Sequence, residues 1–174
     1  MDTPLTLALS SQRPATGDAH LKFRLGHQTP AVFSMQCVQE ALILPARRLT
    51  PMPNVPAPLL GLINRRSRVL WVLDLAQILG LALLDLNAQQ YTLVLIQVGA
   101  VSLGLAVQQV EGIVRLAPEA IQPPVGQISS SLVPYLRGCA LQHQEEKQEI
   151  VLVLDAEAIV QSPLLRNLQF STGS

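Results

Sequence analysis

The sequence predicts an all-β protein that consists of two small β-barrels with short capping helices. Apolar runs rich in Val, Leu and Ile alternate with short polar segments containing Gly, Pro and Asn, a pattern typical of strands joined by tight turns. One strand-and-helix pattern occurs twice, in residues 69–78 and in residues 150–159. Short strands with close turns tend to close into a barrel, because closure leaves no unpaired strand edge.

The internal repeat extends beyond one strand and one helix. Residues 32–44 resemble residues 104–116 in their apolar pattern. Further along, Gly61 and Gly138 are expected to begin two corresponding hairpins, the second with a longer turn. Two β-units of the same plan therefore follow one another, and neither is long enough to be stable alone.

An Asp residue precedes a short helix in each copy of the repeat. Asp74 and Asp155 each end an apolar run, and apolar residues follow them at helical spacing. The side chain of an N-cap Asp accepts a hydrogen bond from the first helical turn. This structural role is sufficient for both carboxylates, so the sequence does not favour a catalytic pair.

Turn residues separate the predicted strands along the chain. Strands are predicted for residues 20–25, 31–44, 59–64, 69–73, 91–98, 101–107, 135–141 and 149–154, while residues 110–116 are an apolar segment with interspersed charge. Residues 31–44 also fit a helical period, and we favour a strand because the neighbouring segments are strand-like. Gly99 is expected at a hairpin turn, residues 118–131 in a loop and residues 143–148 at a solvated hairpin tip.

One domain is predicted between two tails. Residues 1–19 are polar and read as a flexible N-terminal tail, residues 20–162 hold the two pseudo-repeated β subdomains, and residues 163–174 form a C-terminal tail. The charge-free run at residues 86–110 is interrupted by glutamines and Gly99, which favours a hairpin over direct membrane insertion. The N-terminal residues lack the basic start and apolar core of a secretion signal, so a cytoplasmic location is expected.

Composition and residue spacing exclude several classes of function. Twelve acidic residues balance twelve basic residues, so the chain lacks the basic character of a protein that binds nucleic acid. The cysteines Cys37 and Cys139 and the histidines His20, His27 and His143 are scattered. Metal sites need ligands at short spacings, and we therefore predict no metal site and no cofactor. Both cysteines are expected to be small buried residues.

A series of short motifs follows the same order as in a known protein family. The motifs are Val38-Gln39-Glu40, Pro53-Asn54-Val55-Pro56, Gly61-Leu62-Ile63-Asn64 with Arg66, residues 69–75 with Asp74, residues 104–110, Tyr135-Leu136-Arg137-Gly138 and Leu154-Asp155. This series resembles the CheW family from about residue 23 to residue 160. The resemblance implies two SH3-like five-stranded β-barrels around a shared core. It also implies a non-catalytic adaptor, not an enzyme, that couples methyl-accepting chemoreceptors to a CheA-type histidine kinase in a pathway controlling motility.

The resemblance also implies a receptor-binding site. Its residues here are Val38, Glu40, Gly61, Asn64 and Arg66. The guanidinium of Arg66 offers a rigid fork of donors beside a turn, where a helical receptor tip can approach. Glu40 alternatively reads as a solvated surface acid. The kinase-binding residues are unknown from the sequence.

The chain departs from the family pattern at several positions. Arg65 replaces the Leu of the family's Asn-Leu-Arg-Gly turn, and Ser67 replaces its Gly. Because only Gly adopts positive φ freely, the turn conformation at Ser67 is in question. Trp71 stands where Pro is usual, and Gln108 where an acid is usual.

Two alternatives remain open at the level of sequence. One is a small-molecule-binding or enzymatic β-barrel that uses a groove between the barrels, which would require buried His, Cys or carboxylate groups there. The other is an adaptor that serves phototaxis or type IV pilus motility in place of swimming. The arginines of residues 65–68 also fit an ordinary solvated turn or, less well given the neutral total charge, a basic patch for nucleic acid.

Overall fold

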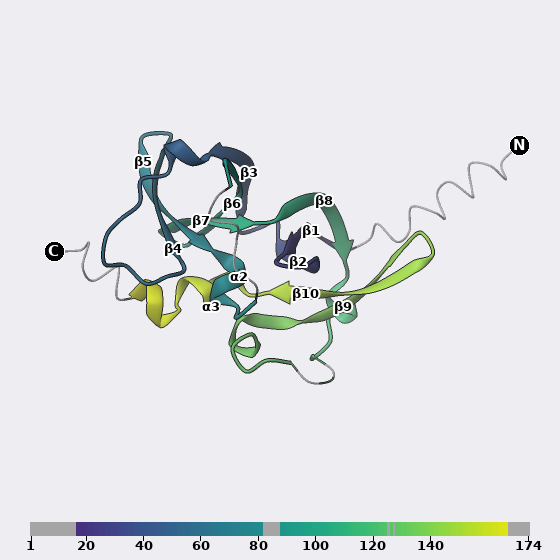
Figure 1. The fold of residues 1–174 in the computed structure, drawn as a ribbon. Helices are drawn as coiled ribbons and strands as arrows, with labels where there is room; N and C mark the ends of the chain where they lie inside the picture. Colours follow the sequence, from purple (N-terminus) through teal and green to yellow (C-terminus); the bar gives the residue numbers. More distant parts are fainter. Residues whose placement is uncertain (1–16, 82–87, 125, 127, 167–174) are drawn as a thin grey trace, which may run out of the picture.

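The computed structural model describes residues 17–81, 88–124, 126 and 128–166, which form two five-stranded sheets (Figure 1). The strands are β1 (Asp18–Leu25), β2 (Thr29–Ser34), β3 (Val38–Pro45), β4 (Leu59–Arg65), β5 (Arg68–Asp74), β6 (Gln90–Val98), β7 (Val101–Val107), β8 (Gln109–Leu116), β9 (Leu136–Gln144) and β10 (Lys147–Leu154). The helices are α2 (Leu75–Ile78) and α3 (Ala156–Val160), with 3-10 turns η2 (Ala46–Arg48), η3 (Pro118–Ala120) and η4 (Val133–Tyr135). The predicted all-β class with short capping helices is confirmed.

Each sheet closes into a barrel. Barrel A has the strand order β8-β1-β2-β10-β9, and barrel B has the order β3-β6-β7-β5-β4. In barrel A the chain beyond β8 bonds to the opposite edge, where Gln122 and Cys139 exchange backbone hydrogen bonds of 2.8 and 2.7 Å. In barrel B the chain beyond β3 does the same through Thr50 and Leu62, at 2.8 and 2.9 Å. The prediction of two small barrels is therefore confirmed.

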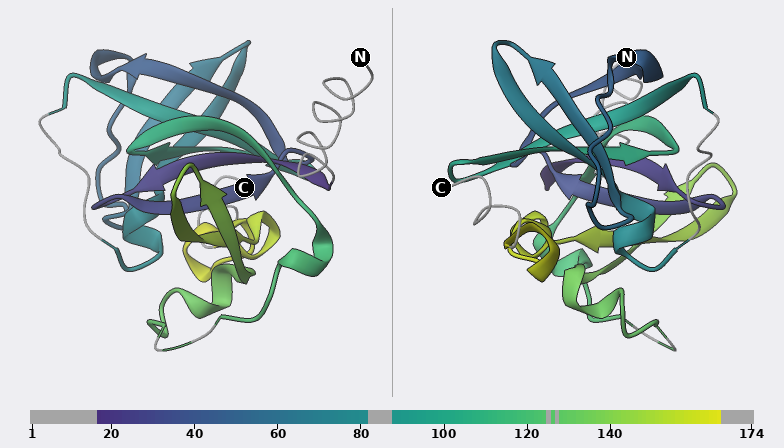
Figure 2. Two further views of the ribbon diagram at one scale, coloured as in Figure 1. Left: turned by 90° about the vertical axis from the view of Figure 1, so that its right-hand side faces the viewer. Right: turned by 60° about the vertical axis from the view of Figure 1, so that its left-hand side comes forward.

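Each barrel combines strands from both halves of the chain. Barrel A takes β1 and β2 from the first half and β8, β9 and β10 from the second, whereas barrel B takes β3, β4 and β5 with β6 and β7. In both views of Figure 2, the blue and teal strands of barrel B lie above the purple and yellow-green strands of barrel A. The two sequence repeats therefore do not correspond to the two barrels.

The strand register confirms the internal repeat. In barrel A, β2 pairs in parallel with β10, and Val32 lies opposite Val153. In barrel B, β7 pairs in parallel with β5, and Gly104 lies opposite Val72. These are the positions that the sequence repeat aligns. Both helices also begin as predicted, because Asp74 and Asp155 accept hydrogen bonds from the first helical turns at 3.4 and 3.2 Å.

The main hydrophobic core lies between the barrels. Barrel A encloses a small cluster around Val151, and barrel B encloses one around Leu93. A larger cluster joins residues of both barrels and both helices, and the rings of Phe23 and Phe33 stack in it with centroids 5.4 Å apart. Because this shared core holds most of the fully buried large side chains, the barrels stabilise each other.

Several predicted boundaries differ from the observed ones. Residues 31–44 form two strands joined by a turn at 35–37, and the hairpin tip is only Glu145 and Glu146, because strand pairing continues to Gln144 and Lys147. Strand β1 begins at Asp18, so the part of the predicted N-terminal tail at residues 1–16 lies outside the described residues. Of the predicted C-terminal tail, residues 163–166 are described and 167–174 are not.

The charge-free run around Gly99 forms a hairpin, as predicted. Strands β6 and β7 pair antiparallel on either side of Gly99, which has a φ of +60°. In the described part of the chain, no helix has both the length and the hydrophobicity needed to span a membrane.

Candidate partner-binding site

All five residues of the predicted receptor-binding site belong to barrel B. Val38 and Glu40 lie on β3, Gly61 and Asn64 on β4, and Arg66 in the turn between β4 and β5. Glu40 and Arg66 come together, with Arg66 Nη2 3.6 Å from Glu40 Oε2. The structure therefore brings two of the five residues into direct contact at one end of the barrel.

Arg65 is the principal partner of Glu40. Its Nε and Nη2 donate to the two carboxylate oxygens of Glu40 at 2.9 and 2.8 Å, which is the two-pronged geometry that suits a guanidinium and a carboxylate. The hydrogen bond from Arg65 lowers the pKa of Glu40 below its ordinary value. Glu40 is therefore not an isolated surface acid, and Arg66, with a side chain 77% exposed, has donors available for a partner.

The turn that carries Arg66 has an unusual backbone. Arg66 and Ser67 have φ angles of +54° and +65°. A two-residue hairpin loop with positive φ at both positions matches the right-handed twist of the flanking strands. Ser67 therefore adopts the conformation that Gly would adopt more easily, which resolves the question raised by the sequence.

The other predicted residues lie away from this ion pair. A Cβ on Gly61 would lie 2.3 Å from the carbonyl oxygen of Thr50, so Gly61 allows two backbone segments to approach closely. Val38 is half-buried and packs against the shared core, whereas Asn64 is exposed and lies opposite Val69, which is also exposed. Gly61 and Val38 therefore have structural roles whether or not a partner contacts them.

A pocket of about 180 Å³ opens at this end of barrel B. We call it the barrel B mouth, and it is lined by Gln39, Glu40, Arg65, Arg66, Arg68, Leu70, Leu95 and Ser102, from all five strands of the barrel and the β4–β5 turn. Sequence reasoning did not assign Arg65, Arg68 or Ser102 to the site. The sequence feature that could have indicated them is the charged run at residues 65–68, because arginines on both sides of a two-residue turn lie opposite each other on paired strands.

A second pocket, of about 160 Å³, contains residues of both barrels and bears on the alternative of a ligand-binding groove. It is lined by Ser34, Gln36, Cys37, Gln97, Val98, Arg137, Leu154, Ala156 and Glu157. Cys37 is half-buried, its thiol contacts the carbonyl oxygen of Ser34 at 3.1 Å, and burial raises its pKa. A raised pKa disfavours the thiolate that a nucleophile needs. This pocket therefore offers little support for an enzymatic site.

The comparisons with known proteins agree on one family. The model of the CheW-like domain family matches residues 19–164. A probable chemotaxis protein CheW from Rhizobium etli is 38% identical over 117 residues, which cover 67% of this chain and 72% of that protein. The chain belongs to the CheW-like family. A chemotaxis protein CheW from Rhizobium meliloti is 33% identical over 103 residues, which cover 59% of this chain and 64% of that protein.

A solved structure has the same fold. The scaffolding protein TtCheW from Thermoanaerobacter tengcongensis superposes with a TM-score of 0.70 at 17% identity, covering 85% of this chain and 95% of that one. At this identity the likeness concerns the fold alone. Membership of the CheW-like family supports a scaffold or adaptor role in chemotaxis signal transduction rather than an enzymatic one.

Proposed function

We propose that this protein is a cytoplasmic adaptor that couples a methyl-accepting chemoreceptor to a CheA-type histidine kinase and so takes part in the control of motility. The proposal rests on the match of the CheW-like family to residues 19–164. The observation that supports it in the structure is the contact of Glu40 with Arg66 at the barrel B mouth, because both positions were assigned to receptor binding from the family motifs.

The geometry of the mouth suits docking of another protein. Arg66 projects from a rigid two-residue turn with its side chain 77% exposed, and the flanking strands belong to a closed barrel. A turn held between two paired strands does not have to order its backbone on binding, so the ordering cost falls mainly on the arginine side chain. Asn64 and Val69 lie next to it on the same hairpin and extend the exposed surface with one polar and one apolar group.

A binding experiment with purified partners tests the proposal. Calorimetric titration of the full-length protein with the regulatory domain of a CheA-type kinase, and separately with the cytoplasmic tip of a receptor from the same cell, should show saturable binding of both. Binding of neither fragment by protein with a normal thermal transition would contradict the adaptor role.

A pair of variants tests the receptor site. Arg66→Ala should weaken binding of the receptor tip by roughly tenfold and leave the melting temperature nearly unchanged, because an exposed interfacial charge contributes more to association than to folding. Arg47→Ala is the matched control, since Arg47 is exposed on η2 and does not line the mouth. Equal loss of affinity in both variants would contradict a role specific to Arg66.

A further inference from the structure

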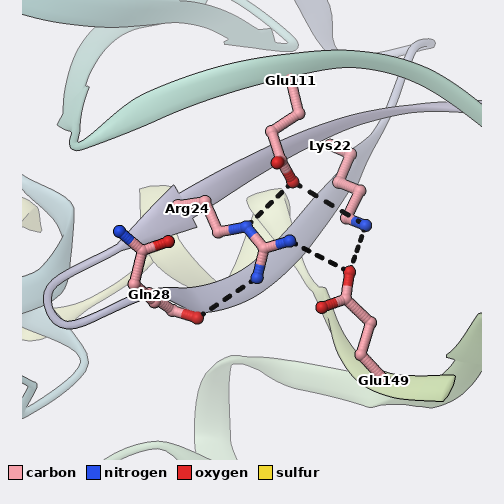
Figure 3. Close-up of polar contacts among 5 residues, drawn as sticks. All are labelled: Lys22, Arg24, Gln28, Glu111 and Glu149. Carbon is pink, nitrogen blue, oxygen red and sulfur yellow. Dashed lines mark hydrogen bonds and ion pairs between the residues drawn. The ribbon is translucent and has the colours of Figure 1, made fainter. Parts of the chain in front are cut away.

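The end of barrel A that corresponds to the barrel B mouth is filled by an internal cluster of charges (Figure 3). Lys22 is only 2% exposed and forms an ion pair with Glu149, while its Nζ lies 3.7 Å from Glu111. Arg24 bonds to the same two carboxylates, at 2.9 Å to Glu111 and 3.1 Å to Glu149. The charges of two positive and two negative side chains therefore cancel within barrel A.

Strand register identifies the matching positions in barrel B. Each barrel has a β-bulge at the same place in its strand pairing. In barrel A the bulge leaves Glu111 of β8 without a cross-strand partner on β1, and in barrel B it leaves Gln39 of β3 without one on β6. Given as barrel A residue and barrel B residue, the matching positions are Lys22 and Leu95, Arg24 and Gln97, Glu111 and Gln39, and Glu149 and Arg68. The ion pair of Arg24 with Glu111 thus becomes a hydrogen bond between two glutamines, and an arginine takes the position of Glu149.

The barrel B mouth consequently carries positive charge without enough internal counter-charge. Its three arginines share one carboxylate, that of Glu40, which Arg65 engages with both oxygens. Among the described residues, Arg68 has no carboxylate within 4.0 Å, and the buried hydroxyl of Ser102 has no hydrogen-bond partner. A buried polar atom without a partner is costly, and a ligand that accepts a hydrogen bond would remove that cost.

We propose that the barrel B mouth binds the carboxylate of an acidic side chain presented by the protein's receptor partner, with Arg68 and Ser102 as its donors. The incoming carboxylate supplies from another molecule the kind of negative charge that Glu149 supplies within barrel A. The volume of about 180 Å³ is large enough for a carboxylate and its methylene stem. The identity of the partner rests on the proposed function, whereas the affinity of the mouth for a carboxylate does not.

The variant Arg68→Glu tests the proposal, because it builds the carboxylate of barrel A into barrel B. Residue 68 lies directly opposite Arg65, so the new side chain would have an arginine as its cross-strand neighbour. The receptor tip should bind this variant at least about tenfold more weakly than the wild type, while its melting temperature stays equal or rises. Arg48→Glu is the matched control: it makes the same charge change outside the mouth and should bind normally.

A second measurement separates this proposal from the proposed function. Acetate, titrated against the full-length protein at constant ionic strength, should shift the side-chain Nε–Hε NMR signals of Arg65 and Arg68 in a saturable way. The shifts should disappear in Arg68→Glu and persist in Arg48→Glu. If the wild type binds no receptor but acetate gives this pattern, the adaptor role fails and the carboxylate site stands. Equal receptor binding by wild type and Arg68→Glu, or absent acetate shifts, would overturn the carboxylate site.

Discussion

Barrels A and B have the same strand plan and differ most at one end. In barrel A four charged side chains satisfy one another and close the end, whereas in barrel B three arginines surround a pocket with a single glutamate. The difference shows that one backbone plan supports either an internally neutralised end or an open charged one. The choice depends on a few side chains, chiefly Glu149 against Arg68 and Lys22 against Leu95.

The closed end also joins the two halves of the chain. Lys22 and Arg24 come from β1 in the first half, and Glu111 and Glu149 come from β8 and β10 in the second. Because Lys22 is almost fully buried, its charge depends on these carboxylates for compensation. Barrel A therefore uses its ions for its own structure, whereas in the part of the chain that the structure describes most arginine donors of the barrel B mouth are bonded to no carboxylate.

The largest expected effect concerns a feature that the barrels share. Gly61→Ala and Gly138→Ala should each lower the free energy of unfolding by about 3 kcal/mol, since a Cβ would lie 2.3 or 2.4 Å from a backbone oxygen that cannot move away. Urea denaturation of both variants measures this. Gly112→Ala is the reference for backbone strain alone, because Gly112 also has a positive φ, of +131°, but nothing lies within 4 Å of a Cβ there. If only one of the two variants lost much of its free energy of unfolding, the two glycines would not have equivalent structural roles.

A change at the ion cluster should separate the barrels. Glu149→Ala should reduce the free energy of unfolding by about 2 kcal/mol, because it removes the carboxylate bonded to buried Lys22 while Glu111 remains 3.7 Å away. The matched change in barrel B, Arg68→Ala, should have little effect, since Arg68 is exposed. Chemical denaturation at neutral pH gives both values, and similar losses in the two variants would contradict the contrast.

The same cluster predicts a dependence of stability on pH. The hydrogen bond from Lys22 lowers the pKa of Glu149, so its stabilising effect is present above the unfolded carboxyl pKa of about 4.3 and is lost as the pH falls through the lower folded value. The free energy of unfolding should therefore decrease in acid, below about pH 4.3. Glu149→Gln should show a shallower decrease in a urea series at different pH values. Parallel curves for the two proteins would contradict this assignment.

The smallest expected effect concerns the turn at the barrel B mouth. Ser67→Gly should raise the free energy of unfolding by about 1 kcal/mol, because Ser67 has a φ of +65°. Gly99→Ala provides the reverse change at a φ of +60° with no atom within 4 Å of a Cβ, and it should cost about 1 kcal/mol. Thermal unfolding measures both. A loss of stability in Ser67→Gly would mean that the serine side chain stabilises the turn.

The sequence predicted the candidate site only in part. Glu40 and Arg66 were named from family motifs, and they lie 3.6 Å apart, although their role in receptor binding stays a prediction. Arg65 and Arg68 were interpreted as part of a solvated turn or of a basic patch, because their relation to Glu40 depends on which strands lie near β4 and β5 in the barrel. The closeness of Arg65 to Glu40, 25 residues away in the sequence, follows from barrel closure and not from any local pattern.

Local patterns were sufficient for the Asp caps of both short helices and for the Gly99 turn, because each depends on residues close together in the chain. The repeat and the fold class followed from the order of such patterns along the chain. The tertiary structure was needed to show that the barrels draw strands from both halves, with β1 and β2 joining β8, β9 and β10, and with β6 and β7 joining β3, β4 and β5. It was also needed to reveal an arginine-rich mouth in barrel B and an internally neutralised end at the equivalent place in barrel A. These features depend on contacts between distant strands, and in such strands an apolar alternation specifies which face is buried but not which strand is the neighbour.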